Sequence, residues 1–151
     1  MAEKFKGVFP VYNMKIKIST DGGTTEPDVD IADLETMGIS IDGNVENWTP
    51  FGSAGWARSL MTGKAFSIEF SGKRHVGDPG NDYVAETAWK DGLSCSTKMA
   101  IEFPDGGKLS FACVLNVTNV AGGDSTNVAP LEFTAQGDGK PTWTPAATPT
   151  A

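Results

Sequence analysis

The feature that most constrains this chain is a strict alternation of apolar and polar residues in most of its regular segments. In FSIEF, residues 66–70, the three apolar side chains fall on one side and the two polar ones on the other. This period of two is typical of a strand with one buried face, and such strands usually pair antiparallel. Eighteen glycines and nine prolines in 151 residues supply the turns that many strands require. The pattern predicts a mainly β fold.

Alternation of this kind recurs along the chain and divides it into strands. The alternating segments cover residues 12–19, 36–41, 45–48, 66–70 and 128–135. The first segment would place Tyr12 and Ile18 on the same buried face, and the last would point Leu131 and Phe133 inward. Asp-Gly pairs favour tight turns, so we expect the first strand to end at residues 21–23 and the second at residues 42–43.

The clearest local prediction is a hairpin around FPDGG, residues 103–107. Pro104 and Asp105 suit a type I turn, and Gly106 suits the left-handed position that follows it. A three-residue loop keeps inward residues opposite inward residues. The predicted pairs are Ile101 with Leu109, Met99 with Phe111 and Thr97 with Cys113.

This register bears on the two cysteines of the chain. Cys95 would lie opposite Leu115, diagonal to Cys113 at about 7–8 Å, which is too far for a relaxed disulfide. We therefore expect two free thiols, as in a protein made and kept in a reducing cytoplasm.

One segment has the pattern of a helix. Asn81 or Asp82 would cap it, residues 83–89 would form it, and Gly92 would close it. The predicted fold is an antiparallel β-sandwich or barrel with one short flanking α-helix. We expect a single domain over residues 1–142 and a flexible C-terminal tail over residues 143–151, which is rich in Pro and Thr.

Two further segments carry aromatic residues without regular alternation. Residues 44–64 are predicted to form a long loop, and residues 1–10 an N-terminal arm. Both could fold back over an open end of the sandwich. Exposed apolar groups more often mark interfaces, so both could instead contact neighbouring subunits. The candidate interface residues are Phe5, Phe9, Trp48, Phe51, Trp56 and Leu60.

Composition disfavours several function classes. The net charge of −7 disfavours gripping nucleic acid through its phosphates. The chain lacks a phosphate-binding loop, a G-x-S-x-G element and any metal-ligand spacing, and it has a single histidine, His75. Asp78 and Asp82 near that histidine suit turn and helix-cap roles better than catalysis. We expect no enzyme activity, no metal, no cofactor and no membrane span, and the N-terminus does not resemble a secretory signal.

The stretch IDGNVENWTPFGSAGWARSLMTGKAFSIEFSGKRHVGDPGNDYVAETAWKDG resembles the major tail tube proteins of long-tailed bacteriophages. The resemblance lies in the order of an Asp-Gly pair, a Trp-Thr-Pro loop, a Gly-Trp pair, a Leu-x-Thr-Gly-Lys segment and a Gly-Asp-x-Gly-Asn-Asp-Tyr helix start. The later FPDGGKLSFACVLNV hairpin and the LEFTAQGDGKPT strand also match the family's layout. In all, the resemblance covers residues 10–142.

The resemblance implies a structural virion protein that forms hexameric rings, which stack into a hollow tube for genome delivery. It implies contacts between rings through residues 44–64 and the N-terminal arm. Implied partners are further copies of the chain, a tape measure protein, a baseplate hub or initiator, a terminator and, in a contractile tail, a sheath. DNA would pass through the lumen without specific binding. The implied location is the tail of a virion assembled in the host bacterial cytoplasm, and the tube of a contractile bacteriocin or type VI-like system would look the same.

An acidic lumen would repel DNA phosphates and let the genome slide. Glu69, Glu102 and Glu132 lie on the polar faces of predicted strands and could face the lumen or plain solvent. Two other classes of function stay open. Four tryptophans could support a carbohydrate-binding β-sandwich, and a small hydrolase would have to depend on His75.

Overall fold

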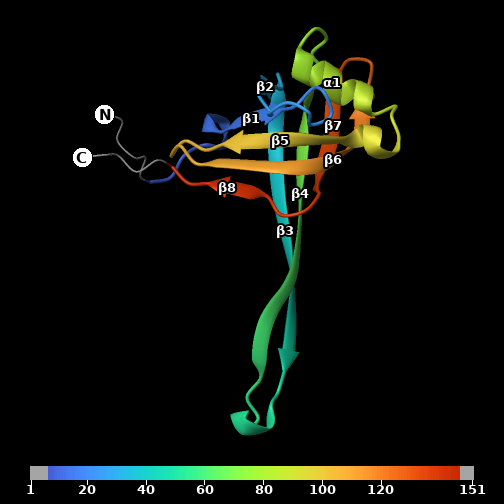
Figure 1. Ribbon diagram of the computed structural model, residues 1–151. Helices are drawn as coiled ribbons and strands as arrows, with labels where there is room; N and C mark the ends of the chain where they lie inside the picture. Colours follow the sequence, from blue (N-terminus) through green and yellow to red (C-terminus); the bar gives the residue numbers. More distant parts are fainter. Residues whose placement is uncertain (1–6, 147–151) are drawn as a thin grey trace, which may run out of the picture.

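The structure, a computed structural model, describes residues 7–146 (Figure 1). Its strands are β1 (Lys15–Ile18), β2 (Val29–Asp30), β3 (Leu34–Trp48), β4 (Arg58–Lys73), β5 (Ser96–Glu102), β6 (Lys108–Val120), β7 (Pro130–Gly137) and β8 (Thr142–Thr144). The helical elements in this range are the α-helix α1 (Pro79–Thr87) and the short 3-10 turns η1 (Val11–Asn13), η2 (Phe51–Ser53) and η3 (Gly92–Cys95). No helix among these residues is long and apolar enough to cross a membrane.

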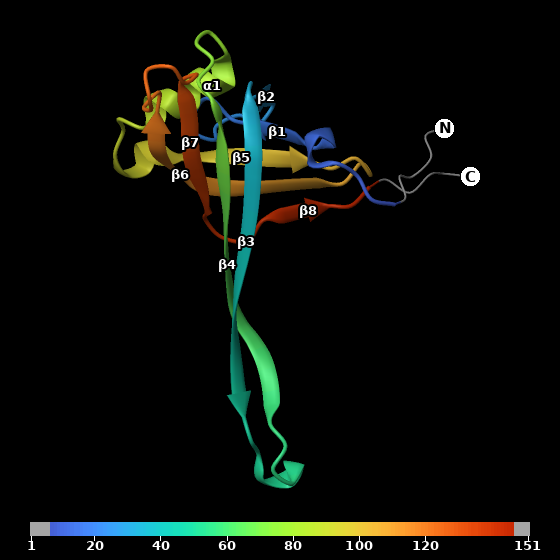
Figure 2. The ribbon, with the colours of Figure 1, turned by 180° about the vertical axis from the view of Figure 1, so that it is seen from behind.

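All strand pairs are antiparallel, as predicted, and the strand order is β2-β1-β5-β6-β7-β4-β3, with β8 beside the start of β6. Strand β6 links two layers, because its first half pairs with β5 and its second half with β7. Figures 1 and 2 show β1, β5 and β8 running across β3, β4 and β7 at a steep angle. The sheet therefore folds over itself into a sandwich.

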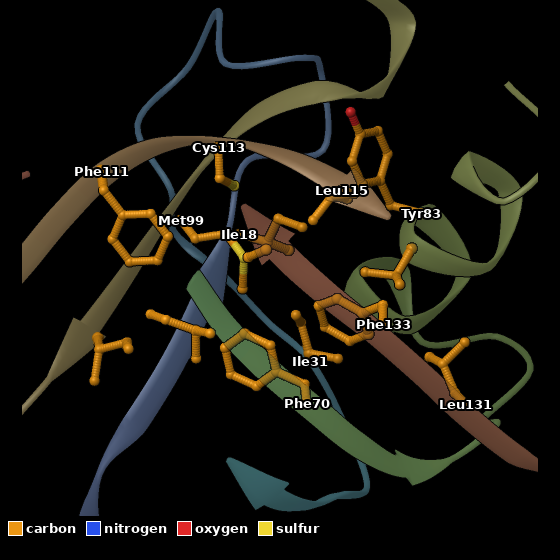
Figure 3. Packing of buried hydrophobic residues seen from close by; sticks show 14 of the residues in the cluster. Ile18, Ile31, Phe70, Tyr83, Met99, Phe111, Cys113, Leu115, Leu131 and Phe133 are labelled. Carbon is orange, nitrogen blue, oxygen red and sulfur yellow. The ribbon is translucent and has the colours of Figure 1, made fainter. Parts of the chain in front are cut away.

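The core lies between these two layers. Phe70 of β4 stacks on Phe133 of β7 with ring centroids 4.9 Å apart, and Phe66 meets Phe111 of β6 edge-on at 5.3 Å. Figure 3 shows side chains from both layers converging on one apolar interior. The alternation in residues 66–70 is confirmed, because its three apolar side chains are buried.

Helix α1 covers one end of this interior. Val84 is completely buried and Tyr83 nearly so, and the latter enters the core from the side (Figure 3). The helix begins earlier than predicted: Asp78 is the N-cap, accepting a hydrogen bond from the Asn81 backbone N–H at 2.9 Å. Pro79 follows as the first helical residue, a position that suits proline because its missing N–H would have no helical partner.

The hairpin over residues 103–107 is confirmed in detail. Gly106 has a φ of +92°, and the pairs Ile101–Leu109, Met99–Phe111 and Thr97–Cys113 all form. Both cysteines are free thiols. Strand β7 likewise buries Leu131, Phe133 and Ala135, which confirms the inward face of the last predicted strand.

Other boundaries differ from the predictions. Residues 11–13 form η1 instead of strand, so Tyr12 is exposed while Ile18 is buried. Strand β3 does not end at residues 42–43 but continues without a turn to Trp48. The predicted tail from residue 143 is wrong at its start, because Trp143 and Thr144 belong to β8 and pair with the start of β6. The rest of the predicted tail from residue 147 lies outside the described residues.

Candidate assembly surfaces

Strands β3 and β4 form a hairpin far longer than the sandwich is thick. Within the body, β7 pairs with β4 as far as Ser67, so the hairpin belongs to a wider sheet. From Phe66 toward the hairpin tip, β3 and β4 pair only with each other among the described residues, and the last pair is Trp48 opposite Arg58. In Figure 1 this two-stranded ribbon extends away from all other elements. The ribbon is thus a projecting arm.

The prediction of a long loop over residues 44–64 is therefore wrong in structure. These residues form the outer strands and the turn of the hairpin. Their sequence lacks alternation because a ribbon with no core beside it does not bury one face. A bulge between Asn44 and Val45 breaks the period further.

The hairpin tip, residues 49–57, has a defined structure. The Ser53 hydroxyl donates to the Pro50 carbonyl at 2.8 Å, and the Trp56 backbone N–H donates to the Ser53 carbonyl at 3.0 Å. Ala54 and Gly55 both have positive φ, which reverses the chain. The Arg58 guanidinium lies 5.6 Å from the centre of the Trp48 ring, a cation–π distance. These contacts within one chain give the tip a defined conformation without a partner.

The structure brings four predicted interface residues together on this arm. Trp48, Phe51, Trp56 and Leu60 are all exposed, and Phe51 fully so. Phe9 is partly exposed and lies just ahead of η1, apart from this group in the sequence, and Phe5 lies outside the described residues.

The outer face of β3, β4, β7 and the second half of β6 is polar. A shallow hollow of about 420 Å³ on this face is lined by Glu69 and Glu132 together with small residues such as Thr36, Gly38 and Thr134. Glu132 accepts a hydrogen bond from the Asn119 side chain at 3.1 Å. These two carboxylates are thus neighbours on one sheet face, an arrangement that the sequence did not predict.

Glu102 does not join them. It lies in β5, in the other layer, where its carboxylate is 3.9 Å from the Lys17 ammonium and its backbone is opposite Lys108. Strand alternation identifies a polar face but not the layer to which that face belongs, so alternation alone could not separate Glu102 from the other two.

An apolar groove lies where the hairpin leaves the body, and sequence reasoning missed it. Its volume is about 590 Å³, and its walls are Ile39, Ile41, Phe66 and Ile68 on one side and Leu109 and Trp143 on the other. Ile41 is 68% exposed and Trp143 52%. Ile39 and Ile41 continue the inward alternation of β3 and pair with the buried residues Ile68 and Phe66, but β3 is the edge strand, so they remain exposed beside the core.

Polar residues at the start of α1 hold the connection between β4 and the helix. Arg74 donates to the Asp82 carboxylate at 2.8 Å, and this hydrogen bond lowers the pKa of Asp82. The buried Asn81 side chain donates to the Ala32 and Lys73 carbonyls. The hydrogen bond that the His75 imidazole makes to the Asp33 carboxylate raises the pKa of His75. Every one of these contacts ties two chain segments together, which agrees with the predicted turn and cap roles of Asp78 and Asp82.

No group of three or more His, Cys, Asp or Glu side chains within residues 7–146 is arranged to hold a metal ion. The tryptophans are dispersed: Trp48 precedes the hairpin tip and Trp56 lies within it, Trp89 follows α1, and Trp143 packs edge-on against Phe103 at 5.4 Å. The three surfaces that stand out are the exposed arm, the polar sheet face and the apolar groove.

No family model and no curated protein matches this chain. Solved structures do match it. A chain in the tail of an empty GTA particle with C6 symmetry is 20% identical, with a TM-score of 0.69 over 91% of this chain and 99% of that chain. A chain in the virion of the native gene transfer agent particle has a TM-score of 0.66 at the same identity and coverage.

A third similar structure is the cap that terminates the tube of the anti-feeding prophage. It is 13% identical, with a TM-score of 0.62 over 97% of each chain. All three matches cover nearly the whole of both chains. This chain therefore has the antiparallel β fold of phage-related tail tube components.

Proposed function

We propose that this chain is a structural subunit that assembles into hexameric rings, and that the rings stack into a hollow tail tube for genome delivery. The observation that carries the proposal is the β3–β4 arm, an ordered ribbon with an exposed apolar tip. An isolated two-stranded ribbon is only marginally stable in water, and exposed apolar patches mark contact sites. We therefore expect the arm to be stabilised by contact with another subunit.

The free edges of the sheet support ring closure. Strand β3 is the last in the strand order, so one edge of its main chain lacks a strand neighbour among residues 7–146. Strand β5 begins opposite Val114, which leaves the Leu115–Val120 part of β6 without a strand neighbour on that side within the same range. Two exposed edges on opposite sides of one sheet suit edge-to-edge pairing in a closed ring, which would remove both.

In such a ring the polar outer face would line the lumen. Glu69 and Glu132 would present negative charge to DNA there, and the accompanying Ser, Thr and Gly residues would offer few groups that hold phosphate. Repulsion at short range would let the genome slide. Glu102 lies in the other layer and has no part in this surface.

The partners follow from the role. Beyond further copies of itself, the subunit would meet a tape measure protein, an initiator at a baseplate hub, a terminator and, in a contractile tail, a sheath. The proposed location is a virion tail, assembled in the host bacterial cytoplasm. The likeness to the cap of the anti-feeding prophage tube supports a second candidate of the same class, the tube of a phage-derived injection device.

Negative-stain electron microscopy of the purified protein over a range of concentrations tests the proposal. We expect six-fold rings or hollow tubes, alone or after addition of preformed tail tips that act as seeds. Monomers that persist in both conditions would contradict it. Binding in a glycan array by such monomers would favour a carbohydrate-binding module instead.

A further inference from the structure

The apolar groove at the base of the arm has the character of a receiving site. Ile39 and Ile41 point from β3 into a space that the sandwich does not fill, and Trp143 of β8 forms the facing wall. Apolar side chains that stay this exposed in one contiguous depression mark a contact surface. Lys64 and Lys140 also line the groove, which gives it a positive charge.

The same chain carries a surface that matches the groove. The hairpin tip, residues 49–57, has no charged side chain and exposes Phe51 and Trp56. Between Gly43 and the tip, the acidic residue of the arm is Glu46, which is exposed and lies two positions before Trp48. The apolar tip matches the apolar groove. Of the two charged residues beside the tip, Glu46 complements the groove lysines, and Arg58 is engaged with the Trp48 ring.

The tip cannot enter the groove of its own chain. Ladder pairing runs in the hairpin from the groove residue Ile41 to Trp48, with one bulge between Asn44 and Val45, so the ribbon holds the tip away from the body. Ten residues separate Ile41 from Phe51, which at roughly 3.3 Å per residue places them about 33 Å apart. The occupant must therefore be the tip of another copy.

The geometry points to a head-to-tail contact in which Phe51 and Trp56 of one subunit fill the Ile39, Ile41 and Trp143 groove of a second copy in the next ring. The inference rests on the proposed function and names the surface that receives the arm. Two different surfaces meet, so the contact repeats without end along one direction. Successive subunits would then be offset along the arm by about 33 Å, the distance estimated above between Ile41 and Phe51.

Paired cysteines test this contact. The background is Cys95→Ser, which keeps a hydroxyl able to donate to the Lys90 carbonyl, as the thiol does now. Cys113 can remain because burial raises its pKa to about 12, which leaves the thiol unreactive. The test variant carries Phe51→Cys and Ile41→Cys in one chain. The matched control carries Phe51→Cys and Ser40→Cys, since Ser40 is adjacent but on the opposite face of β3.

Oxidation of the assembled test variant should give a ladder of dimers, trimers and longer species on a non-reducing gel, because each copy offers both partners. The control should give no species beyond the dimer. No ladder in the test variant, or equal ladders in both, would overturn the inference. Microscopy of the same samples separates the two claims. Tubes without a ladder would contradict the tip-in-groove contact but not the tube function. A ladder without rings or tubes would contradict the hexameric tube but not the contact.

A second measurement keeps the tip intact in case Phe51→Cys prevents assembly. In the single Ile41→Cys variant, maleimide should label the thiol at least tenfold more slowly in the assembled than in the unassembled protein. The further substitution Trp56→Ala should restore fast labelling. Slow labelling that Trp56→Ala does not relieve means that another segment, such as the N-terminal arm, occupies the groove, and the inference is then wrong.

Discussion

The imidazole Nδ1 of His75 lies 2.6 Å from the carboxylate Oδ2 of Asp33, although 42 residues separate them in the sequence. Asp33 has a positive φ of 59° and directly precedes β3, while His75 follows β4. The pair therefore fastens together the two ends of the β3–β4 hairpin at its root, opposite to the tip.

This contact makes stability depend on pH. The Asp33 hydrogen bond, aided by the charges of Asp78 and Asp82, raises the pKa of His75. A raised pKa means that the stabilisation is complete below the ordinary value of about 6.5 and is lost as pH rises through the folded-state value. The difference in unfolding free energy between wild type and His75→Gln should be larger near about pH 5.5 than near about pH 8.5.

Urea unfolding of the unassembled protein at both pH values measures this difference. Asp33→Asn serves as the matched variant, since it removes the partner and should abolish the same pH dependence. A difference between wild type and His75→Gln that stays constant with pH would show that the ion pair contributes nothing.

Gly72→Ala should destabilise the root of the hairpin. A Cβ at this position would lie 2.1 Å from the Asp33 carbonyl oxygen and 2.6 Å from the Leu34 Cα, and backbone atoms cannot move aside as a flexible side chain can. Overpacking typically costs roughly 1–3 kcal/mol, and we expect the upper end. The control is Gly38→Ala in the facing strand, where an added Cβ meets nothing within 4 Å. Thermal unfolding of both variants should show a loss for Gly72→Ala alone.

Trp56→Ala should impair assembly and leave folding intact. The side chain is 79% exposed at the tip, so its loss removes little buried surface from the isolated subunit. Phe70→Ala is the contrasting variant: it removes a core ring that stacks on Phe133 and should cost about 3–5 kcal/mol. Sedimentation reports assembly and urea unfolding reports stability. Equal loss of both properties in Trp56→Ala would contradict an interface role.

Glu69→Lys should make assembled tubes retain DNA. The substitution replaces repulsion by attraction on the polar sheet face, and retention should weaken as salt rises because phosphate contacts release counterions. Short double-stranded DNA bound to sedimented tubes gives the measurement. Glu86→Lys makes the same change of charge at an exposed position on α1 and should leave retention at the wild-type level. Equal retention by both variants would place Glu69 outside the lumen.

The two thiols should differ in reactivity. Burial raises the pKa of Cys113 to about 12, whereas Cys95 is partly exposed. A thiol reagent at neutral pH should modify one cysteine per folded chain and two after unfolding in urea. Peptide mapping should assign the first to Cys95. Modification of neither cysteine before reduction would indicate a disulfide and contradict the free thiols.

The sequence predicted those parts of the fold in which a strand has one buried and one exposed face. Phe66–Phe70 and the hairpin at residues 103–107 follow this rule, so alternation and turn chemistry were sufficient for their faces and register. Tyr12 satisfied the same rule by coincidence: it continues the alternation of β1, but the chain turns in η1 just before that strand.

Alternation could not predict the arm, because the ribbon beyond Phe66 has no core to impose a period. Its aromatic residues correctly indicated an exposed apolar surface but not a pair of strands. The groove depends on where β8 lies, and that strand follows Pro141 in a segment whose Pro and Thr content suggested a tail. Placement of this kind is decided by tertiary packing, which outweighs local propensity.

The β3–β4 arm leaves the body on one side only, as Figures 1 and 2 both show. A stack of such subunits has direction: one terminus presents unfilled grooves and the other presents unclaimed tips. These termini differ in shape and chemistry, so growth by addition at one need not resemble growth at the other. A nucleating factor and a stopper would then bind different surfaces, and each could act without recognising the subunits along the shaft.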